Sequence, residues 1–424
     1  MTEQSNQFLT RSELESETSN QLLKTELPVQ DRADLWKDRR KEIKTKNSLL
    51  TKLKDSFDFS TVGMDKTLVL LLVFLVIFGV VMVTSTASYG IIRRGQENIF
   101  GYIIRQISFA LLGFIVMFFM AAFDYHRLNW RLLIAIGPVV LLLNLLPRLM
   151  GDEINGAYRW LELGPINFQP SELAKYYVVV IAASLLAMPV KISRQAMLKR
   201  YFLLLGIILL FTYIIVGPQS NLSTGAIMLM ASFLVILVSV IPFSWFVVPI
   251  ILSGVAGASL ILKTGYRSDR LLGFLNPFSD PTGKTLQVVQ SLYALSMGGL
   301  LGRGLGNSRF KAFWLPFAEN DFIFAIICEE LGLIGGLTIL AALGYLVFTG
   351  MKIGRQAKDL YGLLLAVGIV SVIGLQALIN MGVVMGAFPV TGVTLPFISA
   401  GGTSLIVNLA AMGILLNISK QKRC

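Results

Sequence analysis

A carboxylate stands where a long basic loop gives way to an apolar helix. Asp321 follows the loop formed by residues 263–320, and the seven residues after it are all apolar. A carboxylate at such a boundary can cap the helix that follows it. It can also act as a general base, because apolar surroundings raise the pKa of a carboxyl group. The sequence alone leaves both interpretations open.

The loop 263–320 carries an excess of positive charge, and the topology derived below places it outside the membrane. Its charged residues are Lys263, Arg267, Arg270, Lys284, Arg303, Arg309 and Lys311 against Asp269, Asp280 and Glu319. Basic loops are disfavoured outside, although long loops follow this rule less closely. The excess therefore favours an anionic ligand, such as a phosphate-bearing substrate or a lipid headgroup. The alternative is a solvated loop that contacts headgroups.

A second polar segment, residues 151–170, precedes another apolar run. It contains Arg159 and Trp160 side by side, a pair that is also typical of an interfacial anchor. A proline then marks a helix start, which places Glu172 and Lys175 three residues apart on one face, where they can pair. Ionisable groups that enter a span are costly and usually functional. A plain salt bridge at the helix start is the alternative.

Two further features interrupt the apolar runs of the second half. Glu329 and Glu330 lie inside the helix that begins near Asp321, and Glu329 is about two turns, roughly 12 Å, further along. Carboxylates at this depth are expected to face the protein interior rather than lipid. Prolines and glycines at 389–404 predict a broken or re-entrant segment, which is tolerated only where protein or a cavity surrounds it.

The composition is that of a membrane protein. Of the 424 residues, 54% are hydrophobic and only 15% are charged, whereas soluble domains carry about 25% charged residues. Near-continuous apolar runs favour helices over a barrel, so the predicted fold is an all-α polytopic membrane protein with ten transmembrane helices of about 20 residues each. The expected spans are residues 67–89, 105–123, 131–149, 171–189, 201–216, 224–241, 245–262, 322–350, 362–386 and 401–418.

Lysine and arginine residues gather at both ends of the chain and in the loops after the second, fourth and eighth spans. Such loops stay in the cytoplasm, so both termini are predicted to be cytoplasmic. The expected domains are a polar, largely disordered tail at 1–65, a ten-helix domain at 66–418 that contains the outward loop 263–320, and a short basic tail at 419–424. No cleavable signal is expected, and the basic residues of the first tail would attract anionic membrane lipids.

Several classes of site are excluded by residue counts. The chain has one histidine, His126, and two scattered cysteines, Cys328 and Cys424. These cannot build a zinc site or a Cys–His nucleophile pair, and they imply no disulfide framework. No nucleic-acid partner is expected.

Four segments, in order along the chain, resemble the patterns of one family. They are residues 156–175 (G-A-Y-R-W-L-E-L-G through Q-P-S-E-L-A-K), 266–308, 321–332 (D-F-I-F-A through E-E-L-G) and 389–404. Together they resemble the SEDS family (shape, elongation, division and sporulation), the membrane proteins FtsW and RodA. The resemblance covers residues 65–418, nearly the whole membrane part.

The resemblance implies a peptidoglycan glycosyltransferase at the outer face of the bacterial cytoplasmic membrane. Its substrate would be lipid II, a disaccharide-pentapeptide on undecaprenyl pyrophosphate, and its partners a class B penicillin-binding protein and other divisome proteins. The family's proposed catalytic aspartate falls on Asp321, its important tryptophan on Trp160, and its acid–lysine pair on Glu172 and Lys175. Further substrate-binding candidates in or beside the matched segments are Arg159, Arg267, Arg270, Gln287, Glu329 and Ser399.

Sugar polymerisation needs a base for the acceptor hydroxyl and stabilisation of the departing pyrophosphate. We expect Asp321 to be that base. Arg267 and Arg270, with Arg159 or Lys175, are expected to hold the pyrophosphate. No cofactor is evident and no metal site is expected. A divalent cation could bridge pyrophosphate to Asp321 or Glu329, but no ligand cluster demands one.

The chain departs from the family patterns at several positions. Ser220 and Asn221 stand in place of proline and aspartate, Phe317 in place of glutamate, Asn320 in place of threonine and Ala400 in place of tyrosine. The Asn-Leu-Ser-Thr sequence at 221–224 and the Glu-Glu-Leu-Gly sequence at 329–332 look more like FtsW than RodA, which predicts septal wall synthesis during cell division. A RodA-type elongation polymerase, a lipid II flippase and a scaffold that activates a synthase partner are the alternatives.

Overall fold

The computed structural model describes most of the chain beyond the N-terminal tail, and the structural statements below concern these residues. They are residues 62–93, 99–151, 157–164, 166–187, 193–242, 245, 249, 251, 254, 270, 273–281, 283, 285–315 and 318–421. The predicted tail at 1–61 and most of the predicted span at 245–262 therefore lie outside the described residues.

Helices make up nearly all of the described chain. The long ones are α3 (Lys66–Arg93), α4 (Ile99–Ala122), α5 (Trp130–Met150), α6 (Pro170–Leu186), α7 (Arg194–Val216), α8 (Leu222–Val238), α13 (Ile323–Arg355), α14 (Leu360–Val384) and α15 (Gly402–Lys420). The outer loops hold α11 (Leu286–Gly298), α12 (Phe310–Phe313) and two short antiparallel strands, β1 (Leu161–Leu163) and β2 (Ile166–Phe168). Single 3-10 turns are η1 (Tyr125–Arg127) and η2 (Pro277–Ser279).

The predicted all-α polytopic fold is confirmed. Each expected span other than 245–262 coincides with a helix, and seven helices of the described chain are long and apolar enough to cross a membrane. The helices α6 and α8 have 17 residues each and are shorter than a full span. Nearly every residue of α6 is buried, so this helix packs inside the bundle rather than against lipid.

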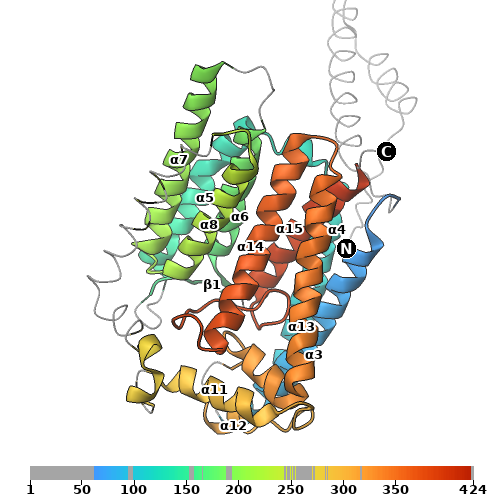
Figure 1. The fold of residues 1–424 in the computed structure, drawn as a ribbon, viewed down its shortest axis with the longest axis vertical. Coiled ribbons are helices and arrows are strands. Elements are labelled where there is room, and N and C mark those ends of the chain that lie inside the picture. The colour runs from blue at the N-terminus through green and yellow to red at the C-terminus, as the bar shows by residue number, and fades with distance from the viewer. Residues whose placement is uncertain are drawn as a thin grey trace, which may run out of the picture. The chain divides into compact units, whose positions relative to one another are not determined.

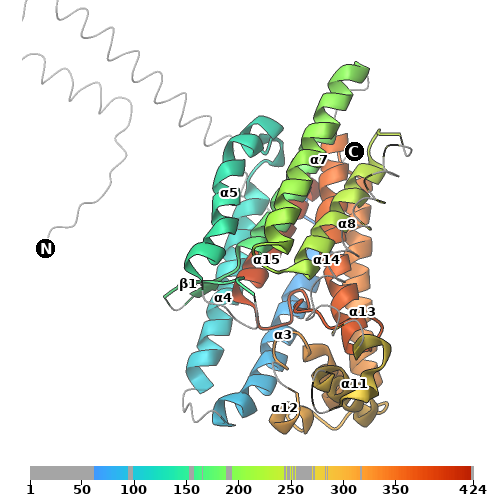
Figure 2. The same ribbon diagram turned by 90° about the vertical axis from the view of Figure 1, so that its left-hand side faces the viewer.

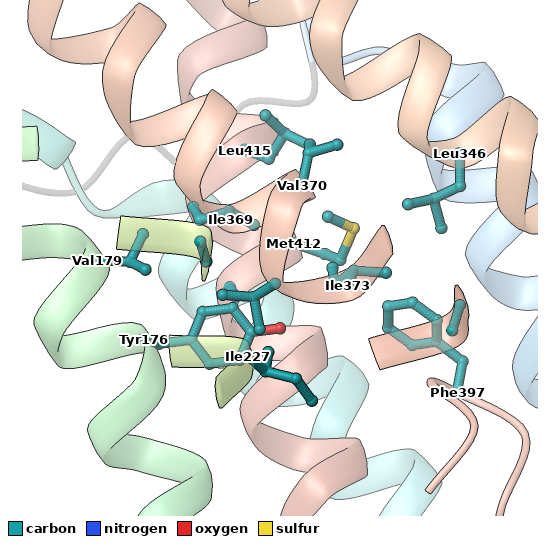
Figure 3. Packing of buried hydrophobic residues seen from close by; sticks show 14 of the residues in the cluster. Tyr176, Val179, Ile227, Leu346, Ile369, Val370, Ile373, Phe397, Met412 and Leu415 are labelled. Carbon is teal, nitrogen blue, oxygen red and sulfur yellow. The ribbon is translucent and has the colours of Figure 1, made fainter. Parts of the chain in front are cut away.

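The long helices form a bundle, and α11 and α12 cross one end of it (Figures 1 and 2). α14 packs against α6, α8 and α13, while α15 packs along α4. Figure 3 shows Ile369 and Val370 of α14 meeting Val179 of α6 and Met412 and Leu415 of α15 in the buried core. In this core of branched and unbranched apolar side chains, removing one buried Leu or Ile side chain would cost about 2–5 kcal/mol.

Hydrogen bonds at the two ends of the bundle agree with the predicted topology. At one end the hydroxyl of Tyr125 donates to Asp359 Oδ1 at 2.8 Å, and Gln421 Nε2 donates to Asp124 Oδ1 at 3.2 Å. These bonds gather two basic loops and the C-terminal end of α15, all predicted to be cytoplasmic. At the other end Thr403 Oγ1 donates to the carbonyl of Asn167 at 2.8 Å.

The predicted break near the end of the chain is confirmed. Residues 385–401 form no helix or strand, yet Leu395, Phe397 and Ile398 are almost completely buried. A Cβ on Gly79 of α3 would lie 2.7 Å from both the carbonyl oxygen of Phe397 and the Cα of Ile398. The segment is thus enclosed by helices, as irregular backbone at membrane depth must be.

A kink in α13 is a feature that the sequence analysis did not predict. Gly332 has φ +70° and ψ −170° inside the helix. A Cβ there would lie 2.4 Å from the backbone nitrogen of Gly302 and from the carbonyl oxygen of Leu300. Glycine is therefore required at position 332 both for the left-handed backbone and for this close approach. The contact fixes the glycine-rich run after α11, residues 298–307, to α13.

Candidate active site

Asp321 lies just before α13 and does not cap it. The N-cap residue is Phe322, and the helix start has no side-chain cap hydrogen bond, so the capping interpretation is wrong. The backbone of Asp321 is instead held by α14, because Asn380 Nδ2 donates at 2.7 Å to the carbonyl of Asp321 and at 2.7 Å to that of Val393. One buried amide thereby joins the end of the basic loop to the broken segment.

The side chains of Asp321 and Arg159 meet at a glycine. A Cβ built on Gly392 would lie 3.5 Å from Asp321 Oδ2 and 3.2 Å from Arg159 Nη1. Gly392 is exposed, and both charged residues are partly exposed, so a ligand outside the membrane can reach this point. The structure therefore brings together two predicted site residues that are far apart in the sequence.

Arg270 is a second guanidinium beside the same carboxylate. Its Nη1 donates to the carbonyl of Val390 at 3.1 Å, and Arg159 Nη2 donates to the carbonyl of Ser220 at 3.0 Å. A main-chain carbonyl is a neutral acceptor, so it orients a guanidinium without cancelling its charge. Two oriented cations close to one carboxylate are suited to hold an anionic group.

Opposing influences act on the pKa of Asp321, which lies outside the membrane-spanning helices. Burial raises the pKa of Asp321 to about 6, while the charges of Arg159 and Arg270 oppose that rise and Glu319 adds to it. A carboxyl group with this pKa is mostly ionised at neutral pH and is a stronger base than an ordinary aspartate. A raised pKa of this size suits the role of general base that the sequence analysis expects for Asp321.

The predicted pair of Glu172 and Lys175 is confirmed and lies deeper in the bundle. Lys175 Nζ donates to Glu172 Oε2 at 2.8 Å and to Gln376 Oε1 at 2.5 Å. Gln376 Nε2 in turn donates to the carbonyl of Thr394 at 2.9 Å. Because Thr394 lies two residues after Gly392, this buried chain supports the broken segment from below the site.

Glu329 and Glu330 belong to a different hydrogen-bond network, and both are fully buried as predicted. Glu329 accepts hydrogen bonds from the hydroxyl of Ser308 and from the backbone N–H of Arg309. Glu330 is paired with Lys311, and neither side chain is exposed. These carboxylates fix the glycine-rich run and α12 to α13, so the neighbours of Glu329 are structural groups of the loop.

The remaining candidates lie in other surroundings. Trp160 is partly exposed and immediately precedes β1. Gln287 is partly exposed in the first turn of α11. Ser399 is buried, and its hydroxyl accepts a 2.7 Å hydrogen bond from the backbone N–H of Leu395 within the broken segment. Arg267 lies outside the described residues.

Two site residues were missed from the sequence, Gln376 and Asn380 of α14. They are buried polar residues four positions apart in an otherwise apolar helix, which places them on one helical face. Polar groups inside a span are a signal for function or for a structural hydrogen bond. Their spacing could therefore have indicated that this face of α14 supports the site.

The arrangement of possible metal ligands can be compared with the cation considered from the sequence. Among them, no group of three or more His, Cys, Asp or Glu side chains comes together in a way that could bind a metal. A divalent cation that bridges pyrophosphate to Asp321 or Glu329 therefore stays a prediction.

The fold and the site together define a class of protein. It is a polytopic helical membrane protein in which a carboxylate and two guanidinium groups meet at one end of the bundle, above an enclosed broken segment. The chain belongs to the FTSW/RODA/SPOVE family, described as "Cell cycle protein", whose model matches residues 65–424. The resemblance to the SEDS family is thereby confirmed.

Named relatives and solved structures agree with this assignment. Stage V sporulation protein E of Bacillus subtilis (strain 168) is 40% identical over 365 residues, which are 85% of this chain and 98% of the relative. A probable peptidoglycan glycosyltransferase FtsW of Geobacter metallireducens is 37% identical over 378 residues, 85% of this chain and 95% of the relative.

Two solved structures have the same fold. A chain from a peptidoglycan synthase complex, described as coordinating polymerization and crosslinking, has a TM-score of 0.68 and 29% identity, and the match covers 84% of this chain and 98% of that one. The rod shape determining protein RodA of Thermus thermophilus has a TM-score of 0.62 and 27% identity over 85% of this chain and 98% of that one.

Proposed function

We propose that this chain is a peptidoglycan glycosyltransferase that polymerises lipid II at the outer face of the cytoplasmic membrane. The family assignment and the relatives that bear the name peptidoglycan glycosyltransferase support the reaction class. The position of the charged site, at the predicted outward end of a membrane bundle, suits a substrate with a polar sugar headgroup and a lipid tail.

The proposed reaction is a single displacement at the anomeric carbon of a lipid-linked donor glycan. The carboxylate of Asp321 takes the proton from the GlcNAc hydroxyl of the acceptor lipid II. The resulting oxygen forms a bond to the anomeric carbon, and the bond from that carbon to the pyrophosphate breaks with its electron pair. Undecaprenyl pyrophosphate leaves, and the configuration of the anomeric carbon is inverted.

The leaving group is a dianion or trianion, and its developing charge needs fixed cations. Arg159 and Arg270 supply two guanidinium groups next to Asp321, and each can bind phosphate oxygens through parallel N–H donors. We assign Lys175 to support rather than to phosphate binding, because its ammonium group is buried and bonded to Glu172 and Gln376. Trp160, Gln287 and Arg267 remain proposed contacts to the substrate.

The observation that carries the proposal is the meeting of Asp321 and Arg159 at exposed Gly392. A base and a cation beside one small residue can serve the two ends of a displacement reaction, the acceptor hydroxyl and the leaving group. A residue with a side chain at position 392 would fill the space between them.

Partners and cellular role are finer parts of the proposal. A class B penicillin-binding protein would cross-link the product, which agrees with the pairing of polymerization and crosslinking in the solved complex. We place the enzyme at the division septum because its signatures are closer to FtsW. One relative is a sporulation protein, so a role in spore-wall synthesis is a further possible result of the test. A fluorescent fusion to this chain would show whether it lies at midcell, along the side wall or at the forespore.

The direct test is polymerisation of labelled lipid II by the purified chain, with and without its partner synthase. Wild type should form glycan, and Asp321→Asn should bind lipid II but polymerise it about 10²–10⁴-fold more slowly. Normal glycan from Asp321→Asn would show that the base assignment is wrong. Movement of lipid II across liposomes without any polymer would favour a flippase.

A further inference from the structure

The turn between α7 and α8 holds one of its residues in an unusual conformation. Ser220 has φ +53°, and in the described chain only Phe397 shares a positive φ among residues other than glycine. Left-handed backbone at a residue with a side chain costs about 1–2 kcal/mol and persists only where the surroundings enforce it. The strain therefore needs a cause in the contacts around it.

The neighbours of Ser220 enforce this conformation from both sides. The backbone N–H of Ser220 donates to the carbonyl of Gly217 at 3.1 Å, and that of Asn221 donates to the carbonyl of Ile215 at 2.9 Å. The side chain of Asn221 caps α8 by accepting from the backbone N–H of Thr224 at 3.3 Å. The residues on both sides of Ser220 are therefore fixed by hydrogen bonds to α7 and α8.

That carbonyl reaches the site. It accepts a 3.0 Å hydrogen bond from Nη2 of Arg159, and Nη1 of the same guanidinium lies beside Gly392, where Asp321 Oδ2 also lies. One terminal nitrogen of the planar guanidinium, Nη2, is thus anchored on the α7–α8 turn, while the other, Nη1, lies at Gly392. Because the fork is rigid, fixing one nitrogen fixes the other.

We propose that Ser220 is a positioning residue, whose left-handed backbone aims its carbonyl at Arg159 and so holds the guanidinium beside Asp321 for the pyrophosphate of the lipid-linked donor. This inference rests on the proposed function. The positioning group is the main-chain carbonyl, so the serine hydroxyl is not required. What is required is a residue that tolerates positive φ.

The chain differs here from its family pattern, which has proline where Ser220 stands. Proline fixes φ near −65° and cannot adopt the conformation of Ser220. The anchor for Arg159 is therefore built in this chain by a turn that a proline would not allow. Proline at this position is expected to change how tightly the donor pyrophosphate is held, rather than to abolish the chemistry.

Two substitutions separate backbone conformation from side-chain chemistry. Ser220→Gly removes the hydroxyl but allows positive φ, so kcat and KM for lipid II should stay within about twofold of wild type. Ser220→Val is β-branched and resists positive φ. It should raise KM for lipid II about tenfold, as expected for the loss of one charge-assisted hydrogen bond, with a smaller loss in kcat.

The pH profile gives a readout that a general weakening of the turn would not produce. The charged groups that face Asp321 are Arg159, Arg270 and Glu319. If Arg159 moves away in Ser220→Val, one of the two charges that lower the pKa of Asp321 is lost. The acid limb of the rate profile should then shift to higher pH, while Ser220→Gly should leave it in place.

A double-mutant cycle with Arg159→Ala decides the question. Ser220→Val should have almost no further effect on KM or on the acid limb once Arg159 is absent. Equal effects of Ser220→Val in both backgrounds, or no effect in either, would overturn the inference. Ser220→Ala, a milder change, replaces Ser220→Val in the cycle if thermal unfolding shows that the valine variant is misfolded.

The same assay keeps this inference separate from the proposed function. Asp321→Asn is measured alongside for both polymerisation and binding of labelled lipid II. If Asp321→Asn polymerises normally, the proposed base is wrong, yet the coupling between Ser220 and Arg159 can still be read from lipid II binding. If Asp321→Asn is inactive and the cycle shows no coupling, only the role of Ser220 is wrong.

Discussion

Carboxylates nine residues apart in one stretch of chain have opposite surroundings. Asp321 is partly exposed beside Arg159, and its backbone rather than its side chain is tied down by Asn380. Glu330 is completely buried, bonded to Lys311 and to the hydroxyl of Ser85. The carboxylate of Asp321 is therefore accessible to a substrate. The carboxylate of Glu330 is neutralised by Lys311, and its bonds hold α3, α12 and α13 together.

This fold assigns different roles to the two carboxylates: Asp321 is placed for reaction with a substrate, and Glu330 stabilises the packing of the helices. A carboxylate that is fully buried and paired with a lysine, as Glu330 is, is out of reach of a substrate hydroxyl. Asp321 is partly exposed and is held by Asn380 through its backbone carbonyl, so its carboxylate can take a proton from a substrate.

The largest effect on activity is expected at Asp321. Asp321→Asn removes the base while keeping the size of the side chain, so the rate of lipid II polymerisation should fall by about 10²–10⁴-fold. Single-turnover polymerisation by purified protein measures it. Lipid II binding should change little, because the amide still fits beside Gly392.

The stability of the same variant gives a control on this prediction. Burial raises the folded-state pKa of Asp321 to about 6, above the value of about 3.9 for an unfolded chain. The ionised side chain therefore opposes folding as pH rises through this window, and Asp321→Asn should unfold at the same or a higher temperature than wild type. A clear loss of thermal stability would mean that Asp321 is structural.

The second largest effect is expected at the buried ion pair, and it concerns stability. Lys311→Ala leaves Glu330 buried without its cation, which costs about 3–5 kcal/mol. Thermal unfolding in detergent should show the loss, and activity should fall only as far as the folded fraction does. Replacing both partners, Lys311→Met with Glu330→Leu, should recover most of the stability. A double variant as unstable as Lys311→Ala would argue against the pairing.

An intermediate effect is expected at Asn380, which belongs to the site through the backbone of Asp321. Asn380→Ala leaves the carbonyls of Asp321 and Val393 without a donor, at a cost of about 1–3 kcal/mol. The polymerisation rate should fall by about 10–100-fold, because the base loses its fixed position. The matched variant Asn408→Ala, which removes a buried amide of α15, should affect stability more than the acid limb of the pH profile.

The smallest effect is expected at Gly392. Gly392→Ala places a methyl group 3.2 Å from Arg159 Nη1, so the guanidinium must shift by a few tenths of an ångström. We expect KM for lipid II to rise by about three- to tenfold with folding unchanged. Gly206→Ala, where an added Cβ meets nothing within 4 Å, is the control. Equal behaviour of the two variants would remove Gly392 from the site.

Much of the fold could be predicted from the sequence. Hydropathy indicated the positions of the helices, and the distribution of lysine and arginine indicated which loops share one end of the bundle. The i, i+3 spacing of Glu172 and Lys175 also predicted their pair correctly. The sequence did not predict the kink at Gly332 or the approach of Arg159 to Asp321, because both depend on contacts between segments far apart in the chain. From the sequence, Glu329 is a candidate for substrate binding because it follows Asp321 on the same predicted helix. In the structure its carboxylate accepts hydrogen bonds from Ser308 and Arg309 instead.

We propose above that Asp321 is the general base, and burial raises the pKa of its carboxyl group to about 6. The most direct test is the pH dependence of kcat/KM for lipid II polymerisation, measured for wild type and for the residual activity of Asp321→Asn. Wild type should lose activity about tenfold per pH unit below a midpoint near pH 6, because the carboxylate becomes protonated. Asp321→Asn should lack this limb. A wild-type profile that is flat through this range, or a limb that persists in Asp321→Asn, would contradict the account.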